Sequence, residues 1–529
     1  MNIGLFAGPT FRPHPEHVSW LGQLAKAGGH RVVGLSCDGA VSDCYGRALL
    51  GRSRMGCIPC SLAGLRAYPG VEIQSARALT GSSTPSGWRD AEVLSSVRTI
   101  LREEDDLRLG GPEATALMSR LAAPAAQMYA KCCEWIRREQ LDAVLVFNGR
   151  MDVTRAAIRA AQHCGIRFAA IERASFDTGV RVTPMTDCNS LRSEHRLQAI
   201  FRDVPLLADQ AAFAADFIAR RVMRMPVSEW RSYNPDRVAA EWPHPATGAR
   251  VLVGPSSQYE VRGEEGWEEL GDMREAVDEV VERLGPGASV VVRGHPVWGE
   301  TIAGATGESA ARYYREWCSQ RGYAFVEPDS KADTRSLMMQ ADVVLATGGT
   351  IGIEAACAGR AVLALAPCYY QASGAVGNAV GPGSSESALM IRQVAPRERI
   401  RHALRAIYTH AYRSTQYCRY MRPVPGSQGA EWEYRSDADF SQVERALVSG
   451  FTQADDERVA TDTTAEDAVI DSMQGEHWGE LVDDAQRHRR EPSISGGEWR
   501  RLRLSIPARV LLSVRGRLPK GDRLRGTKR

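Results

Sequence analysis

The segment between residues 347 and 354, Thr-Gly-Gly-Thr-Ile-Gly-Ile-Glu, has the residue types that could hold a phosphate and a ribose. Gly348, Gly349 and Thr350 lie between an apolar run and a helical pattern, so backbone N–H groups and the positive end of a helix would meet there. Glu354, one turn into that helix, could accept hydrogen bonds from the two ribose hydroxyls. The alternative is a tight strand-to-helix turn whose acid only favours the helix dipole.

Polar residues also follow two earlier apolar runs, at points where parallel strands would end. Ser256 and Ser257 come after one run, and Arg293 and His295 come at the end of the next. Because the carboxyl ends of parallel strands share one edge of a sheet, these side chains are expected near the phosphate turn. His295 could stabilise a leaving phosphate, and Arg293 could assist unless its side chain points into the sheet. A histidine after a strand is otherwise a structural hydrogen-bonding group.

The first half of the chain offers a second set of polar strand ends. Asn148 and Arg150 follow one apolar run and are succeeded by Asp152, while Glu172 and Arg173 end the next run. Displacement at a sugar–phosphate bond needs a base that takes a proton from the attacking hydroxyl, and Asp152 and Glu172 are the candidates. Each of these acids could instead begin a helix or form an ion pair.

These residues belong to two stretches in which apolar runs alternate with helical patterns, which predicts parallel sheets covered by helices on both faces. Residues 1–225 form the first stretch and residues 249–395 the second. Neither has Gly-x-Gly-x-x-Gly after its first strand, so a dinucleotide site is not indicated. A chain of 529 residues exceeds one hydrophobic core. We therefore predict the GT-B fold, an α/β architecture of two facing Rossmann-like domains with ligands between them.

The rest of the chain departs from this pattern. Residues 396–450 are predicted to be helical, and residues 451–529 form an acidic and then basic extension that is expected to be largely flexible. Residues 499–529 interleave arginines with aliphatic side chains, which favours contact with an anionic membrane surface. A solvated tail is an alternative. A nucleic-acid arm is another, but the tail lacks interleaved aromatic residues, so no nucleic acid is expected.

Composition sets few limits on partners and location. The formal charge of +2 points to no particular partner. No apolar stretch approaches the roughly 20 residues of a membrane span, and the N-terminus enters a strand-like run without a signal sequence. The expected location is therefore cytoplasmic, peripheral at the inner face of the cytoplasmic membrane through the basic tail.

Four cysteines follow the second strand-like run with a spacing that could bind a metal. Cys37, Cys44, Cys57 and Cys60 form the pattern C-x6-C-x12-C-x2-C. A C-x2-C knuckle with two further thiols can close a tetrahedral zinc site. The alternative is four free thiols, as is usual in a reducing compartment.

Several of these motifs together resemble the bacterial capsule and surface-polysaccharide glycosyltransferases of GT-B fold. The most specific are the Asn148-Gly149-Arg150 turn, the His295-Pro296 pair and the helix start from Thr350 to Glu354, and the resemblance covers about residues 1–420. Members of this family typically carry Ser-Thr where this chain has Gly349-Thr350.

The resemblance implies that the second domain binds a nucleotide-sugar donor and the first an acceptor glycan, without a cofactor for the chemistry. The implied donor residues are Ser256, Ser257, Arg293, His295, Gly348, Gly349, Thr350 and Glu354. The implied acceptor-side residues are Asn148, Arg150 and Arg173. Asp152, Glu172 and His295 are the expected catalytic residues.

We therefore expect a metal-independent glycosyltransferase that acts on a surface polysaccharide or a glycolipid. A nucleotide-sugar 2-epimerase of the same fold is one alternative, and a catalytically degenerate glycan-binding or scaffold protein is another. The sequence does not choose between uridine and cytidine donors.

Overall fold

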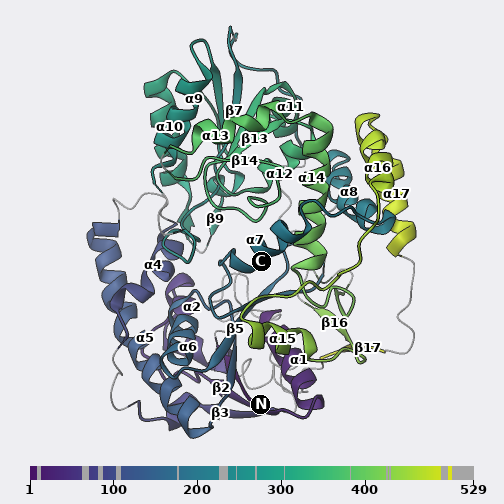
Figure 1. Ribbon diagram of the computed structural model, residues 1–529. Coiled ribbons are helices and arrows are strands. Elements are labelled where there is room, and N and C mark those ends of the chain that lie inside the picture. The colour runs from purple at the N-terminus through teal and green to yellow at the C-terminus, as the bar shows by residue number, and fades with distance from the viewer. Residues whose placement is uncertain are drawn as a thin grey trace.

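The computed structural model has two α/β domains stacked one above the other, with the N-terminal domain at the bottom of Figure 1 and the C-terminal domain at the top. The structure describes residues 1–8, 13–61, 71–81, 87–102, 109–175, 178–225, 236–245, 247–267, 271–302, 304–381, 383–424, 427, 431–489 and 498–502.

The N-terminal sheet has six strands in the order β3-β2-β1-β4-β5-β6. They are β1 (Asn2–Ala7), β2 (Arg31–Ser36), β3 (Glu72–Ser75), β4 (Ala143–Phe147), β5 (Arg167–Arg173) and β6 (Val180–Pro184). All neighbours pair in parallel except β5 and β6. Alternate side chains of a strand face opposite sides of its sheet. Leu5 of β1 therefore packs in the core beside α1, whereas Phe6 packs in the core beside α5 and α6.

The helices of this domain include two long ones that match the sequence pattern closely. They are α1 (His14–Ala27), α2 (Tyr45–Leu49), α4 (Leu94–Leu101), α5 (Pro112–Arg138), α6 (Asp152–His163) and α7 (Arg192–Phe201), with short 3-10 turns at Arg54–Gly56, Ala76–Ala78 and Asp90–Val93.

The C-terminal sheet has the same architecture, with six parallel strands in the order β11-β8-β7-β12-β13-β14. They are β7 (Arg250–Gly254), β8 (Ser289–Arg293), β11 (Ala324–Val326), β12 (Val343–Ala346), β13 (Ala361–Ala364) and β14 (Gly377–Asn378), and a small hairpin of β9 (Thr301–Ile302) and β10 (Ala305–Thr306) follows β8. Two facing Rossmann-like domains with parallel sheets confirm the predicted fold class.

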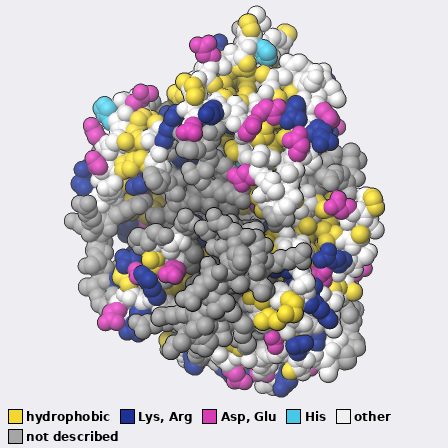
Figure 2. Space-filling view, turned by 180° about the vertical axis from the view of Figure 1, so that it is seen from behind, with side chains coloured by type: hydrophobic (Ala, Val, Ile, Leu, Met, Phe, Trp, Pro, Cys, Tyr) yellow, Lys and Arg dark blue, Asp and Glu magenta, His cyan; other side chains and the backbone are white. Residues whose placement is uncertain are grey.

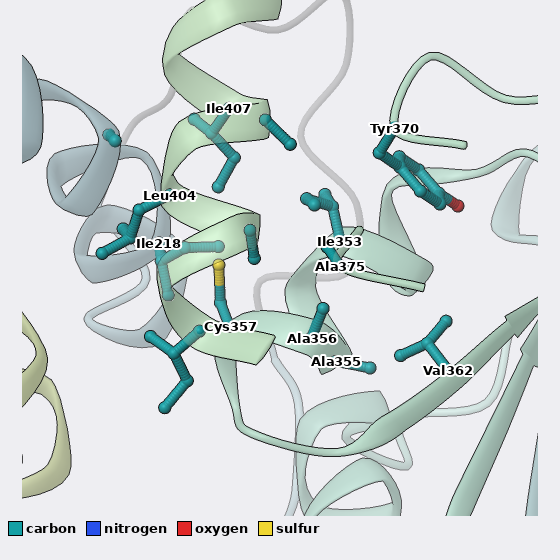
Figure 3. Packing of buried hydrophobic residues seen from close by; sticks show 14 of the residues in the cluster. Ile218, Ile353, Ala355, Ala356, Cys357, Val362, Tyr370, Ala375, Leu404 and Ile407 are labelled. Carbon is teal, nitrogen blue, oxygen red and sulfur yellow. The ribbon is translucent and has the colours of Figure 1, made fainter. Parts of the chain in front are cut away.

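Helices cover both faces of this second sheet. They are α8 (Ala208–Val222), α9 (Met273–Leu284), α10 (Glu308–Arg321), α11 (Thr334–Gln340), α12 (Thr350–Cys357), α13 (Ser385–Leu389) and α14 (Pro396–Tyr408), with short turns at Pro296–Gly299 and Met390–Gln393. Figure 3 shows Leu404 and Ile407 of α14 in the same cluster as Ile353 and Cys357 of α12. Ile218 of α8 belongs to this cluster too, so α8 packs with the C-terminal domain although it lies within the predicted N-terminal range 1–225.

After α14 and a π-helical turn (Thr409–Arg413) the chain returns to the N-terminal domain. There α15 (Ser441–Ser449) joins the core beside α1, and β15 (Met421–Pro423), β16 (Trp432–Arg435) and β17 (Trp499–Arg501) form an antiparallel sheet. In its described residues, the predicted helical segment 396–450 thus has one α-helix on each domain with two strands between them.

The expectation of a largely flexible extension is wrong for its acidic part. Helices α16 (Thr464–Gln474) and α17 (Trp478–Arg489) pack on the C-terminal domain, where Ile470 and Leu481 are buried. Arg405 of α14 donates two hydrogen bonds of 2.8 Å to the fully buried carboxylate of Glu466. Composition suggested flexibility because the arginines that neutralise these acids lie some sixty residues earlier in the chain.

The basic tail begins as a strand. Trp499 pairs with Arg435 in the β16–β17 ladder, and the guanidinium of Arg422 lies 4.1 Å from the centre of its indole ring. Residues 503–529, which carry most of the predicted membrane-binding segment, lie outside the described residues.

The described surface has no single dominant charge on the face in Figure 2, and the described helices differ from a membrane span in length or in apolar character. Figure 2 shows basic and acidic side chains intermixed over the described part of one face. Within the described ranges, we find no helix that combines the length and the apolar character needed to cross a bilayer.

Candidate functional site

Loops of the two domains meet at their junction, and arginines of the N-terminal domain bond directly to loops of the C-terminal domain. Arg102, the residue after α4, donates to three carbonyl oxygens within residues 297–305, which follow β8. Its side chain is almost fully buried. Arg98, one turn earlier, donates to the carbonyl oxygen of Arg262 at 2.8 Å. Helix α4 therefore holds two loops at the carboxyl ends of the second sheet.

A buried ionic cluster crosses the same junction. Arg155 of α6 lies 3.1 Å from Asp187 of its own domain and contacts Glu264 of the C-terminal domain. All three residues are buried. Breaking one of these pairs would leave a buried charge uncompensated, which typically costs several kcal/mol. The two carboxyl edges are thus held in a defined mutual arrangement.

The predicted phosphate turn lies at the end of β12. Gly349 occupies the position before α12, and Gly348 has a φ of +105°, which favours glycine. A Cβ on Gly348 would lie 3.2 Å from the carbonyl oxygen of Pro367. Gly348, Gly349 and Thr350 are all half-buried, so an anion could reach the N–H groups that begin the helix.

Neither the available space nor the backbone conformation requires a glycine at position 349. A Cβ at this position would lie 3.6 Å from Oγ of Ser256, an ordinary contact, and φ is −75°. A serine hydroxyl, as in the family that the sequence resembles, would fit beside Ser256 at the start of α12.

Ser256 and Ser257 tie neighbouring strand ends together. The backbone N–H of Ser256 donates to Oγ1 of Thr347 at 2.7 Å, which joins the loop after β7 to the end of β12. Oγ of Ser257 accepts a hydrogen bond of 2.9 Å from the indole of Trp298, in the loop after β8. Three strand ends therefore form one connected rim.

His295 begins the short turn Pro296–Gly299 after β8. Its Nδ1 accepts a hydrogen bond of 3.2 Å from the backbone N–H of Val297. In the neutral ring, an accepting Nδ1 places the proton on Nε2. Because the ring is half-buried, Nε2–H can act as a donor toward an anion at the junction.

Arg293 has a structural role in this conformation. Its guanidinium donates to the carbonyl oxygens of Gly294, Glu327 and Ser330, which holds the loop after β11. Burial lowers the pKa of Arg293. The side chain is committed to this loop, which agrees with the inward orientation considered from the sequence.

Glu354 is the fifth residue of α12, and its side chain faces α8. Its Oε1 lies 3.3 Å from Nε of Arg221, and its side chain is 28% exposed. The carboxylate is therefore accessible to a ligand, and at the same time it is the partner of an arginine that the sequence analysis did not single out.

In the N-terminal domain, Asn148 and Glu172 form one unit. Asn148 has a left-handed φ of +63°, and its amide donates to Oε2 of Glu172 at 2.8 Å. Oδ1 of Asn148 accepts from the backbone N–H of Arg150 at 3.1 Å. The turn after β4 and the end of β5 are thereby fixed against each other.

His14, the first residue of α1, completes this unit and was missed in the sequence. Its Nδ1 lies 3.3 Å from Oε1 of Glu172, and its ring stacks on Phe147 with 4.1 Å between ring centres. Burial is the main cause that lowers the pKa of His14. The signal in the sequence was a histidine between two prolines just after the first strand.

Asp152 is buried at the start of α6. Its two carboxylate oxygens accept from the backbone N–H groups of Tyr45 at 2.6 Å and Val153 at 2.7 Å. Burial raises the pKa of Asp152 to about 7. Asp152 is only 1% exposed, so it cannot contact an acceptor in this conformation. Its position at the first residue of α6 fits the alternative of an acid that begins a helix, and the expected catalytic role does not fit.

Arg150 and Arg173 differ in accessibility. Arg150 is buried, and its guanidinium donates to Oγ of Ser95 at 3.0 Å and Oγ1 of Thr99 at 2.8 Å on α4. Arg173 is half-buried beside Glu172. Of the two predicted acceptor-side arginines, Arg173 is the one that can meet a substrate directly.

The predicted zinc site is not formed. Among the residues that the structure describes, which include Cys37, Cys44, Cys57 and Cys60, no group of three or more potential ligands could hold a metal ion. Burial raises the pKa of Cys37 to about 11, and backbone N–H groups of the following turn surround its sulfur. Cys57 and Cys60 lie in a helical segment. The thiols of Cys37 and Cys60 are close enough to Cys44 to help raise its pKa, although burial is the main cause of that shift.

Comparisons with known proteins give distant structural likenesses. No family model matches the chain, and no curated protein matches it. Similar solved structures include the β-Kdo 2,4 transferase KpsC of Thermosulfurimonas dismutans, with a TM-score of 0.34 and 17% identity over 52% of this chain and 80% of that chain. UDP-GlcNAc 2-epimerase from Neisseria meningitidis, bound to UDP-GlcNAc, has a TM-score of 0.26 and 12% identity over 76% and 94%. A Streptomyces glycosyltransferase has a TM-score of 0.22 and 13% identity over 77% and 95%. Function has to be argued from the site itself.

Proposed function

We propose that the protein is a glycosyltransferase that transfers a sugar from a nucleotide-sugar donor to a surface polysaccharide or a glycolipid. The supporting observation is that the strand ends of the two domains carry two chemically different sets of groups, and that the two domains bond to each other directly. The Gly348–Thr350 turn and His295 offer N–H donors in the C-terminal domain. Glu172, with Asn148 and His14, offers a proton-accepting group in the N-terminal domain.

The two sets match the two demands of glycosyl transfer. The leaving nucleoside phosphate gains negative charge, which N–H groups at a helix start and a histidine Nε2–H stabilise. The attacking hydroxyl loses a proton, which a base on the acceptor side takes. We propose that these donors suffice without a metal ion, so turnover should continue in the presence of EDTA.

The nucleoside is the remaining part of the donor. Glu354 lies one turn beyond the phosphate turn on α12, and its carboxylate is partly exposed. We propose that it accepts hydrogen bonds from the ribose hydroxyls. In that arrangement Arg221 balances the charge of Glu354 and orients its carboxylate.

We further propose that the tail beyond residue 502 binds an anionic membrane surface and that the enzyme meets its acceptor there. The segment 503–529 is rich in arginine, and basic residues near such a surface contribute about 1 kcal/mol each. The enzyme would then work as a cytoplasmic, peripheral protein.

The first experiment is a thermal-shift panel of UMP, UDP, CMP and CDP on the full chain. The nucleotide that raises the melting temperature identifies the donor class, because a ligand that binds only the folded state stabilises it. Sugars on that nucleotide are then incubated with the protein, with and without an acceptor oligosaccharide. Nucleotide release supports transfer, and an epimerised donor supports the 2-epimerase. If neither product forms, both enzymatic readings are contradicted.

A further inference from the structure

We propose that His14 is the proton acceptor for the attacking hydroxyl and that Glu172 is a positioning residue that acts through it. This inference rests on the proposed function and deepens it. The sequence alone pointed to a carboxylate as the base, whereas the geometry assigns that role to an imidazole.

The geometry of His14 separates its two ring nitrogens. Nδ1 is buried and lies 3.3 Å from Oε1 of Glu172, a contact whose angles do not yet make a hydrogen bond. A carboxylate beside Nδ1 favours the tautomer with the proton on Nδ1, so Nε2 carries the free lone pair. Apo structures often show such contacts longer than ideal, and they tighten when substrate binds.

The surroundings fix the ring in this orientation. Phe147 stacks on one face of the imidazole, and Asn148 holds the second oxygen of Glu172 at 2.8 Å. Glu172 is therefore anchored at both oxygens, since Oε1 also accepts from the backbone N–H of Arg173 at 2.9 Å. A histidine oriented by an anchored carboxylate is the arrangement by which a base is held in one tautomer.

Burial keeps the imidazole of His14 neutral. Burial lowers the pKa of His14 most strongly, the carboxylate of Glu172 opposes this shift, and Arg173 adds to it. His17, one turn along α1, is buried with a pKa well below its ordinary value, so it adds no positive charge at neutral pH. A neutral His14 can accept a proton throughout the neutral range.

In the proposed step the acceptor hydroxyl transfers its proton to Nε2 of His14 as its oxygen attacks the anomeric carbon. The new oxygen–carbon bond forms as the bond between that carbon and the donor phosphate oxygen breaks. The electron pair of the broken bond remains on the nucleoside phosphate, and the imidazolium later releases its proton to water. The carboxylate of Glu172 stabilises the imidazolium while it exists.

The test uses the full chain and three variants, His14→Gln, Glu172→Gln and the control His163→Gln, whose histidine lies exposed at the end of α6. Turnover is measured as nucleotide release from the sugar donor found in the panel of UMP, UDP, CMP and CDP. We expect His14→Gln to lower kcat by about 100-fold or more, with the Kd of the free nucleotide unchanged. His163→Gln should retain the kcat of the unaltered protein.

Glu172→Gln should lower kcat less than His14→Gln and should move the acid limb of the kcat–pH profile to lower pH, because the carboxylate raises the pKa of His14. A merely structural Glu172 would leave the position of that limb unchanged, and this result would overturn its positioning role.

Histidine NMR of the unaltered protein provides a measurement that needs neither turnover nor a stable variant. We expect the His14 ring to carry its proton on Nδ1 at neutral pH, and a proton on Nε2 instead would overturn the inference. Full turnover by a folded His14→Gln protein would overturn it as well. A lack of turnover by the unaltered protein on every donor would instead overturn the proposed function.

Discussion

Arg221 and Glu354 form an ion pair between α8 and α12, with 3.3 Å from Nε to Oε1. The two residues come from the predicted first and second domains, yet they meet within the C-terminal domain because α8 packs there. The pair links the helix that begins at the phosphate turn to a neighbouring helix. Glu354 can thus serve as an ion-pair partner, as a ligand for ribose, or as both.

Replacement of this acid separates the two roles. Glu354→Ala should weaken nucleotide binding by about 1–3 kcal/mol, because a charged acceptor of two hydroxyl hydrogen bonds is lost. Titration calorimetry with the nucleotide chosen by thermal shift measures the change. The control Glu386→Ala removes an exposed acid of α13 and should leave affinity unaltered. If both variants bind equally well, Glu354 serves only Arg221.

The turn before α12 offers a gain-of-function test. Gly349→Ser should fold normally and stabilise the protein by a few tenths of a kcal/mol, because serine is a better helix N-cap than glycine. Its hydroxyl should also tighten nucleotide binding. Gly348→Ser is the matched contrast and should cost about 1–3 kcal/mol, since φ is +105° there. Urea unfolding and calorimetry on both proteins check these signs, and a destabilised Gly349→Ser would show that the site has less room than the geometry indicates.

Arg102 should contribute more to the junction than its neighbour Arg98. Arg102→Met leaves three carbonyl oxygens of the loop after β8 without their charged donor, and we expect roughly 2–4 kcal/mol of destabilisation. Arg98→Met also removes a donor to a carbonyl oxygen, but it should cost less because Arg98 is only half-buried, whereas Arg102 is almost fully buried. Chemical unfolding measures the difference, and small-angle scattering should show a larger radius of gyration for Arg102→Met. Equal free energies of unfolding for the two variants would contradict the larger contribution expected of Arg102.

Asp152 predicts a pH dependence of stability with a definite sign. Burial raises its pKa from 3.8 to about 7, so between these values the folded state binds more protons than the unfolded state. The stability of the protein therefore falls through this group as pH rises from about 3.8 to about 7. Asp152→Asn cannot ionise, so its free energy of unfolding relative to the unaltered protein should improve as pH rises from 5 to 8. The exposed Asp483→Asn is the control, and a flat difference for Asp152→Asn would refute the shift.

The tail can be tested by truncation after residue 502, which keeps β17 in its sheet. The shortened protein should retain its melting temperature and its turnover on a soluble acceptor, but it should sediment less with anionic liposomes than the full chain. Raised salt should release the full chain, because the attraction is screened over about 8 Å at physiological ionic strength. Equal sedimentation of both proteins would mean that the tail has no membrane partner.

Helices, strands and turns could be predicted from the sequence better than the contacts between side chains of distant segments. Apolar periodicity located α6 at Asp152–His163 and the phosphate turn at Gly348–Thr350, because both signals are local. The pairing of His14 with Glu172 could not be predicted, since it joins the start of α1 to the end of β5, which lie far apart in the sequence. The helices α16 and α17 were missed for the same reason, because distant arginines such as Arg405 neutralise their acids.

The repeated passage of the chain between the two domains has a mechanical consequence. The chain enters the C-terminal domain before α8, returns after α14 and goes back for α16 and α17, and its last described strand, β17, lies on the N-terminal domain. In Figure 1 α14, α16 and α17 lie on one side of the molecule, whereas α4 with its arginines lies on the other. The molecule thus has a hinge side made of covalent crossings and a latch side made of hydrogen bonds. On the latch side, three hydrogen bonds from Arg102 are what hold the loop after β8 against the end of α4.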